Sequence, residues 1–115
     1  MKQVEHISVA ELQKMAENMY GNLVKAMVDV KKRIMIVDAE LHADEEQYLL
    51  EHGSAQADLW GINLYPGNFG KEGFVEFDSM INIRPRAHNM SRGVEDAAIQ
   101  EAIKSIVAEV VHERL

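Results

Sequence analysis

The most informative absence in this sequence is cysteine, of which there is none. Without cysteine the chain can form no disulfide framework, no thiolate zinc site and no thiol nucleophile. The sequence also lacks the Gly-x-Ser-x-Gly nucleophile elbow and the His-Glu-x-x-His metal-binding helix. These absences exclude several large classes of enzyme and leave binding proteins and enzymes without a recognisable motif.

Positive charge is also scarce, since Asp and Glu outnumber Lys and Arg by 19 to 12 and the net charge is −7. A protein that binds nucleic acid needs a basic face, so we expect no DNA or RNA partner. No segment approaches the roughly 20 apolar residues of a membrane span, and the N-terminus lacks the apolar run of a signal peptide. We therefore expect a cytoplasmic protein without a membrane partner, folded as one domain over residues 1–115.

Three segments carry the signals of helices. Ser8 and Glu11 form a capping-box pattern, and Gly21 is placed to end the helix that follows. Asp44 begins a similar pattern, which predicts a short helix over residues 45–52. Asp96 is a favourable N-cap, and apolar residues at helical spacing predict a long helix over residues 96–115.

The segments between these helices have the patterns of strands. Residues 24–30, 60–65 and 74–84 alternate between apolar and polar side chains, and residues 34–37 form a short apolar run. The resulting order is helix, two strands, helix, two strands, helix. This order predicts an α+β domain of two layers, in which a four-stranded antiparallel or mixed sheet carries the helices on one face.

A sheet covered on one side leaves its other face open. If the alternation holds, that face carries a mixture of apolar and amide side chains, namely Met27, Asn63, Tyr65, Met80 and Asn82. This mixture predicts a homo-oligomer, a dimer or a larger ring, that buries the face between subunits. The alternative is an ordinary hydrated face that contains some methionine.

Four phrases of the sequence, in their order and spacing, resemble a family of short bacterial and archaeal proteins that is catalogued only as a domain of unknown function. The phrases are DAELHADEEQYLLEHGS, DLWGINLYP, FDSMINIRP and SRGVED. The resemblance covers nearly the whole chain from Leu23 onward and implies one domain, but no particular activity. Ala97 stands where the family pattern has proline at the first helical position, a difference that changes helix pre-organisation and no chemistry.

The first candidate site is a run of polar residues spaced by two, Asp38, Glu40, His42 and Asp44. If this segment is extended, the four side chains point to one side, and together they are the ligand set of a divalent metal. A divalent metal is therefore a candidate cofactor. The alternative is structural, because Asp44 is explained by helix capping and Glu40 by a hydrated strand end.

The second candidate site is the loop over residues 84–92. Its candidate ligand-binding residues are Arg84, Arg86, His88, Asn89, Ser91 and Arg92, with the ring of Tyr65 as an exposed neighbour and Trp60 in the core. Guanidinium groups bind carboxylate or phosphate, and the adjacent helix N-terminus adds free N–H donors. No acid occurs in residues 79–94, so we expect an arginine to pair with Asp38, Glu40 or a neighbouring acid, or with an external anion.

Two functions remain open. The first is a non-catalytic, oligomeric binding or accessory protein whose arginine loop pairs with acidic groups or with an anionic ligand. The second is a small enzyme, metal-assisted in one version, that acts on an anionic substrate. In this version His42 or His88 is the acid or base, and an arginine of the loop holds the substrate.

Overall fold

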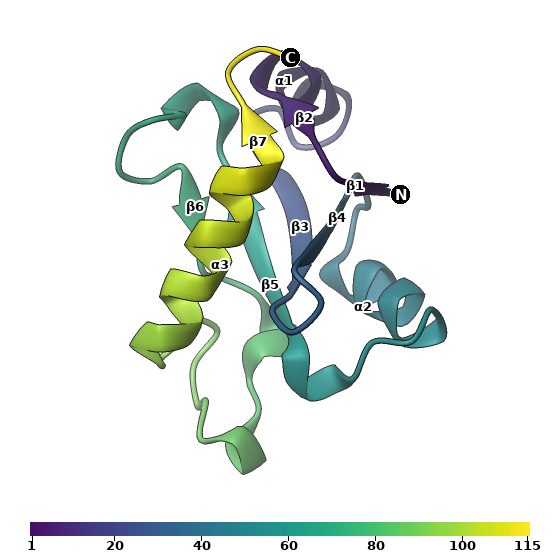
Figure 1. The fold of residues 1–115 in the computed structure, drawn as a ribbon, viewed down its shortest axis with the longest axis vertical. Coiled ribbons are helices and arrows are strands. Elements are labelled where there is room, and N and C mark those ends of the chain that lie inside the picture. The colour runs from purple at the N-terminus through teal and green to yellow at the C-terminus, as the bar shows by residue number, and fades with distance from the viewer.

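Five strands form the main sheet of the computed structural model, which describes all 115 residues (Figure 1). Their order across the sheet is β1-β4-β3-β5-β6, and every neighbouring pair is antiparallel. The strands are β1 (Lys2–Val4), β3 (Val24–Asp29), β4 (Ile34–Val37), β5 (Leu59–Leu64) and β6 (Val75–Glu76). Two further short strands, β2 (Ile7–Ser8) and β7 (Val111–His112), pair in parallel as a separate sheet. The α+β class is confirmed, whereas the expected four-stranded sheet has five strands because β1 adds an edge.

The hairpin between β3 and β4 is the centre of the sheet. The sequence lacks the usual glycine signal at this turn, and the side chain of Asp29 supplies the turn instead. Its Oδ1 accepts hydrogen bonds from the backbone N–H groups of Lys31 and Lys32, both at 2.9 Å, and Arg33 adopts a left-handed backbone with φ of 57°. Ser54 donates a third hydrogen bond to the same carboxylate at 2.6 Å, which ties the turn to the segment after α2.

Two of the three helices begin after a polar capping residue, whereas the N-cap of α2 is Leu41, which makes no side-chain cap. The capping box predicted for α1 (Val9–Asn18) is confirmed, because Ser8 Oγ accepts from Glu11 N and the Glu11 side chain reaches back to Ser8 N. Asp96 caps α3 (Ala97–Val110), which ends before the predicted residue 115 because the chain continues as β7. The second helix, α2 (His42–Glu51), starts three residues earlier than predicted, so Asp44 lies inside its first turn. None of the three helices is both long and apolar enough to cross a membrane.

Helices cover both faces of the sheet, so the expectation of helices on one face is wrong. Successive residues of a strand point to opposite faces. Ala26 and Val28 of β3 belong to a core cluster of 18 residues shared with α1 and α3, whereas Met27 belongs to a cluster of four that includes Leu49 of α2. Figure 1 shows α3 crossing in front of the sheet and α2 lying away from α3. The packing of α2 on the sheet could not be predicted from its acid-rich sequence, because α2 buries Leu49 together with the polar residues His42 and Glu45.

The open sheet face expected from the sequence is not present. Met27 and Asn82 are fully buried and Asn63 is 7% exposed, because α2 and the segment after β6 cover them. Met80 is 69% exposed, but it belongs to a short 3-10 turn and not to a strand, and Tyr65 is half-buried. The sheet face that was expected to form the subunit interface is thus covered within one chain. Oligomerisation remains a prediction, but this face cannot be its interface.

The strand expected over residues 74–84 is wrong beyond Glu76, since only β6 pairs with β5. Gly61 of β5 explains the departure, because Ser79 lies so close that a Cβ on Gly61 would be 2.7 Å from the Ser79 Cβ. The Asn82 amide then takes the place of strand backbone. Its Oδ1 accepts from Gly61 N and its Nδ2 donates to Gly61 O, both at 2.9 Å. The alternating pattern therefore reflects a looped segment that packs against β5.

Candidate binding site

Arg84 is a structural residue of the arginine loop. Its two terminal nitrogens donate to the backbone carbonyls of Gln56 and Leu59, and its guanidinium lies 4.3 Å from the centroid of the Trp60 ring. Burial lowers the pKa of Arg84, and its Nε is buried without a partner. The side chain holds the start of β5 in place, so it is not free to bind a ligand. Trp60 itself is 3% exposed, as expected of a core residue.

Arg92 and Arg86 have different surroundings from Arg84. Arg92 Nε forms an ion pair with Asp78 Oδ1 at 2.6 Å, and Asp78 lies one residue outside the acid-free stretch of the sequence. Arg86 is exposed and forms no ion pair. Within the chain no arginine of the loop forms an ion pair with Asp38, Glu40 or a neighbouring acid, because the loop folds back on the segment that precedes it. Pairing with an acid of another subunit remains a prediction.

The donors expected to bind an anion in this loop are already occupied. The backbone N–H groups of Met90 and Ser91 donate to Glu95 Oε2 at 2.7 and 2.8 Å, and hydrogen bonds from Ser91 and Met90 lower the pKa of Glu95. Asn89, 3% exposed, donates to three backbone carbonyls of the loop and accepts from Glu95 N. His88 adopts a left-handed backbone at the surface, with φ of 59°. The Glu95 carboxylate and the Asn89 side-chain amide thus occupy these hydrogen-bonding groups of the loop.

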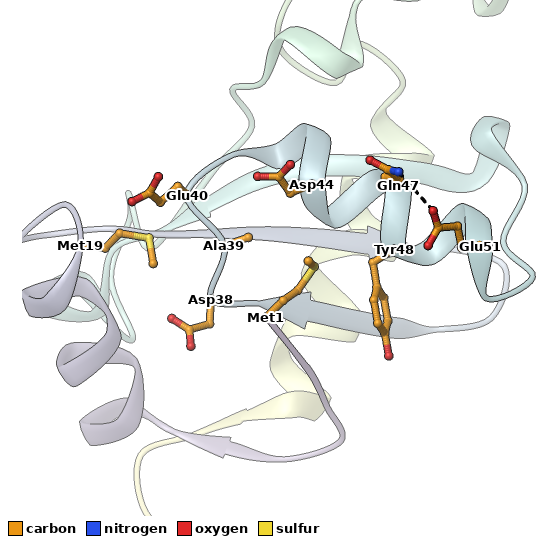
Figure 2. A pocket seen from close by; sticks show the side chains of 9 residues that line it. All are labelled: Met1, Met19, Asp38, Ala39, Glu40, Asp44, Gln47, Tyr48 and Glu51. Atoms are coloured by element: carbon orange, nitrogen blue, oxygen red, sulfur yellow. Dashed lines mark hydrogen bonds between the residues drawn. The ribbon is translucent and has the colours of Figure 1, made fainter.

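The acidic run of the first candidate site does not converge on one point. Asp38, Glu40 and Asp44 line an open pocket of about 470 Å³ beside α2, and Figure 2 shows their carboxylates spread around it. The chain is not extended here, since Asp38 has a φ of 70° and α2 begins at His42. His42 is therefore turned away from the three acids. No three His, Asp or Glu side chains of the chain gather closely enough to hold a metal ion.

A different pocket brings together members of both candidate sites. It lies between β3, β5, the start of α2 and residues 76–81, has a volume of about 530 Å³, and is called the Lys25 pocket below. Its charged and polar lining residues are Tyr20, Lys25, His42, Asn63, Tyr65, Glu76, Asp78, Ser79 and Arg92. His42 comes from the acidic run, and Tyr65 and Arg92 come from the arginine-loop set. The other residues of those two sets lie elsewhere.

Acceptor groups are held in place on one side of the Lys25 pocket. Asn63 Nδ2 donates to Glu76 Oε1 at 2.8 Å and to the Asp78 carbonyl at 3.3 Å, and the Tyr65 hydroxyl donates to Glu76 Oε1 at 3.1 Å. Burial, followed by Glu76, raises the pKa of Tyr65. Because Asn63 Nδ2 has two acceptors, its Oδ1 faces the other way, and this buried oxygen has no hydrogen-bond partner. A buried acceptor without a partner is rare in proteins. This oxygen has almost no accessible surface, so it is not itself a contact for a ligand.

Two cationic groups also line the pocket. Lys25, opposite Asn63 in the β3–β5 register, forms no ion pair, and its Nζ lies 5.2 Å from the centroid of the Tyr20 ring. Arg92 uses only its Nε on Asp78, so its two terminal nitrogens make no hydrogen bond within the protein. Both groups can bind an anion, Lys25 as a point charge and Arg92 as a fork.

His42 contributes a neutral imidazole to the pocket. Burial lowers the pKa of His42, and its Nε2 lies 2.7 Å from the Ile62 carbonyl, so Nε2 carries the proton that is donated to this oxygen. Only Nδ1 is left for a ligand. No carboxylate is hydrogen-bonded to the ring, so His42 lacks the acidic partner that usually orients a catalytic histidine.

Sequence reasoning missed the roles of Lys25, Asn63 and Glu76. The alternation of strands placed Lys25 on a hydrated face and Asn63 on an oligomer surface, which were reasonable local interpretations. Lys25 lies opposite Asn63 because of the register between β3 and β5. Asn63 lies opposite Glu76 because β5 and β6 form a hairpin. The only indication in the sequence was that all three residues occupy polar positions of their strand patterns.

Comparison with known proteins gives a family and no activity. Neither the curated proteins nor the solved structures contain a match to the chain. One family model, described as "Protein of unknown function (DUF5674)", matches residues 3–110. This is consistent with the resemblance carried by the four sequence phrases. Since the match covers nearly the entire chain, the protein belongs to the DUF5674 family of proteins of unknown function.

Proposed function

We propose that this protein is a non-catalytic binding protein whose ligand occupies the Lys25 pocket. The observation that carries the proposal is a pair of cationic groups that line this pocket. The ammonium group of Lys25 forms no ion pair, and the terminal nitrogens of Arg92 make no hydrogen bond within the protein. A ligand with an anionic group would pair with both cations. The proposal keeps the anionic ligand expected from sequence and moves it from residues 84–92 to this pocket.

The chemistry of the pocket defines the class of ligand. Lys25 and the free nitrogens of Arg92 favour a carboxylate or another small anion, while the Glu76 carboxylate favours a hydrogen-bond donor such as an ammonium or hydroxyl group. A small zwitterion or hydroxy acid carries both groups. A pocket of about 530 Å³ is large enough for such a molecule.

Binding is favoured over catalysis by the state of His42. Of the residues named for the enzyme hypothesis, His42 and Arg92 line the Lys25 pocket, whereas His88, Arg84 and Arg86 do not. The His42 ring is fixed by the Ile62 carbonyl and has no carboxylate partner. A general base that is held in this way lacks a hydrogen-bonded carboxylate to stabilise its protonated form.

NMR titration of the ¹⁵N-labelled chain tests the proposal. Glycine, L-serine, lactate and inorganic phosphate are added one at a time, and amide shifts around Lys25, Asn63 and Glu76 are followed. We expect saturable shifts for at least one compound that carries both an anion and a donor. Phosphate, which lacks an ammonium group, separates a general anion site from a zwitterion site.

Two matched variants decide whether the pocket is responsible. Lys25→Met removes the charge in the pocket and keeps the side-chain length, and we expect it to weaken binding about tenfold, as loss of one charged hydrogen bond does. Lys14→Met is the control, because Lys14 is exposed on α1 and lines no pocket. Shifts that are equal in Lys25→Met and wild type, or absent for all four compounds, would contradict the proposal.

A further inference from the structure

The second sheet places two histidines from distant parts of the chain in contact. In the parallel β2–β7 pair, Ile7 lies opposite Val111 and Ser8 opposite His112, and His6 comes directly before β2. His6 Nδ1 lies 2.9 Å from His112 Nε2, and the ring centroids are 5.1 Å apart with planes inclined by 41°. The two residues are 106 positions apart in the sequence. Neither has a role in the Lys25 pocket, and the sequence gave no indication of their contact.

The contact leaves both rings accessible to a ligand from solvent. His6 is exposed and His112 is half-buried, and neither residue forms an ion pair with an acid. Without a ligand, one ring donates an N–H to the lone pair of the other, which uses one nitrogen of each ring. The same two nitrogens can both present lone pairs if the donor ring moves its proton to its other nitrogen. No net proton is released in that change, because both rings stay neutral.

We propose that His6 and His112 form a binding site for a divalent transition-metal ion that prefers imidazole, such as Ni²⁺, Cu²⁺ or Zn²⁺, with water in the remaining positions. A metal–nitrogen distance of about 2.0–2.1 Å places two ligands about 2.9 Å apart at a right angle and about 3.3 Å apart at a tetrahedral angle. The observed separation of 2.9 Å matches the right angle of a square or octahedral site in length, and the rings must turn so that both lone pairs point at the ion and not at each other. A tetrahedral ion requires the rings to separate by about 0.4 Å.

The site differs from the acidic run considered above in the way its ligands are held. The acids beside α2 point apart around an open pocket, whereas these two nitrogens already lie at the distance of neighbouring metal ligands. The ion would link the segment before α1 to the strand after α3. Because folding brings the two nitrogens together, the ion binds the folded chain more tightly than the unfolded chain. Folded protein should therefore gain thermal stability in the presence of the metal.

Isothermal titration calorimetry with NiCl₂ or ZnCl₂ alone, on chain free of any histidine tag, tests the site. We expect one ion per chain and a rise in melting temperature at saturating metal. His6→Gln and His112→Gln should each weaken binding by about tenfold or more, because the loss of one ligand removes the chelate. Both side chains lie at the surface, so circular dichroism should show that the variants fold.

His52→Gln is the matched control. His52 is also exposed, but its Nδ1 is bonded to the Tyr48 carbonyl at 2.7 Å and its ring stacks on Tyr48, away from any second histidine. Binding that survives in His52→Gln and is lost in the other two variants supports the proposal. Absence of binding to wild type, or equal affinity in wild type and His6→Gln, overturns it.

Discussion

The two faces of the main sheet differ in what they bury. The face under α1 and α3 carries the large cluster of 18 apolar residues, whereas the face under α2 carries a cluster of only four. Every buried polar side chain except Asn89 lies on or beside the second face: Asp29, His42, Glu45, Asn63, Ser79 and Asn82. One face is thus an ordinary apolar core, and the other is a mixed interior that contains the Lys25 pocket.

The difference separates the apolar core from the proposed binding surface within one small sheet. Burial of apolar surface is the main favourable term in folding, and most of it lies on the first face. Buried polar groups contribute little net stability and are unfavourable when they lack partners. The second face keeps such groups in Asn63 and Glu45, which is the arrangement expected where a protein binds other molecules.

Truncating one core residue on each face tests this comparison most strongly. Ile106→Ala, in the large cluster, should lower the free energy of unfolding by about 4 kcal/mol, because the removed atoms leave a cavity among many apolar neighbours. Leu49→Ala, in the small cluster, should lower it by about 2–3 kcal/mol, because fewer apolar contacts are lost. Urea denaturation measures both values. A larger loss for Leu49→Ala would reverse the assignment of the two faces.

Adding a methyl group at Gly61, on the second face, should cause the next largest loss in the free energy of unfolding. In Gly61→Ala the new Cβ would lie 2.7 Å from Ser79, so the segment after β6 must move and the two Asn82 hydrogen bonds weaken. We expect a loss of about 3 kcal/mol, at the upper end of the range for overpacking. Gly67→Ala is the control, because nothing lies within 4 Å of its added Cβ and its effect should be small. Equal melting temperatures for the two variants would show that the segment yields freely.

The pH dependence of stability should identify the buried carboxyl group of the second face. Burial raises the pKa of Glu45 from its ordinary value of 4.5 to about 10. Between these values the unfolded chain loses the proton while the folded chain keeps it, so the free energy of unfolding falls as pH rises, by up to about 1.4 kcal/mol per pH unit. Below pH 4.5 this unfavourable term is absent, since both states are protonated.

Glu45→Met should remove that slope and stabilise the protein at pH 7 by about 2 kcal/mol, because no carboxyl group is then buried. Chemical denaturation at several pH values between 5 and 9 measures the slope. Glu17→Met, at an exposed position of α1, should leave it unchanged. A slope that persists in Glu45→Met would assign it to another group.

Local signals predicted the parts of the fold that depend on local physics. Ser8 with Glu11 and Asp96 marked the starts of two helices correctly, because a cap is made by residues a few positions apart. The alternation in residues 60–65 predicted β5 and the buried position of Trp60. In residues 74–84 the same alternation failed, because Asn82 satisfies Gly61 with its side chain and no strand is needed.

The candidate site was less predictable, since its parts meet through tertiary contacts. Tyr65, Arg92 and His42 were named from the sequence, but in two separate constellations. Lys25 was missed as a site residue, and Asn63 was assigned to an oligomer surface, because no sequence pattern shows which residues face each other across β3 and β5. The left-handed backbone of Asp38 interrupts the extended geometry expected for the acidic run, and the residue types did not predict it.

The outer edge of β5 has a consequence for contacts between molecules. A strand with free N–H and C=O groups along one side is a template on which other chains can add strands and aggregate. Here the neighbour β6 pairs only with Asn63 and Leu64, but Asn82 occupies both backbone groups of Gly61, and Arg84 donates to the Leu59 carbonyl. Side chains thus close the part of the edge that β6 leaves uncovered. This protects the sheet from edge-to-edge association while leaving the segment after β6 free to curve over the Lys25 pocket.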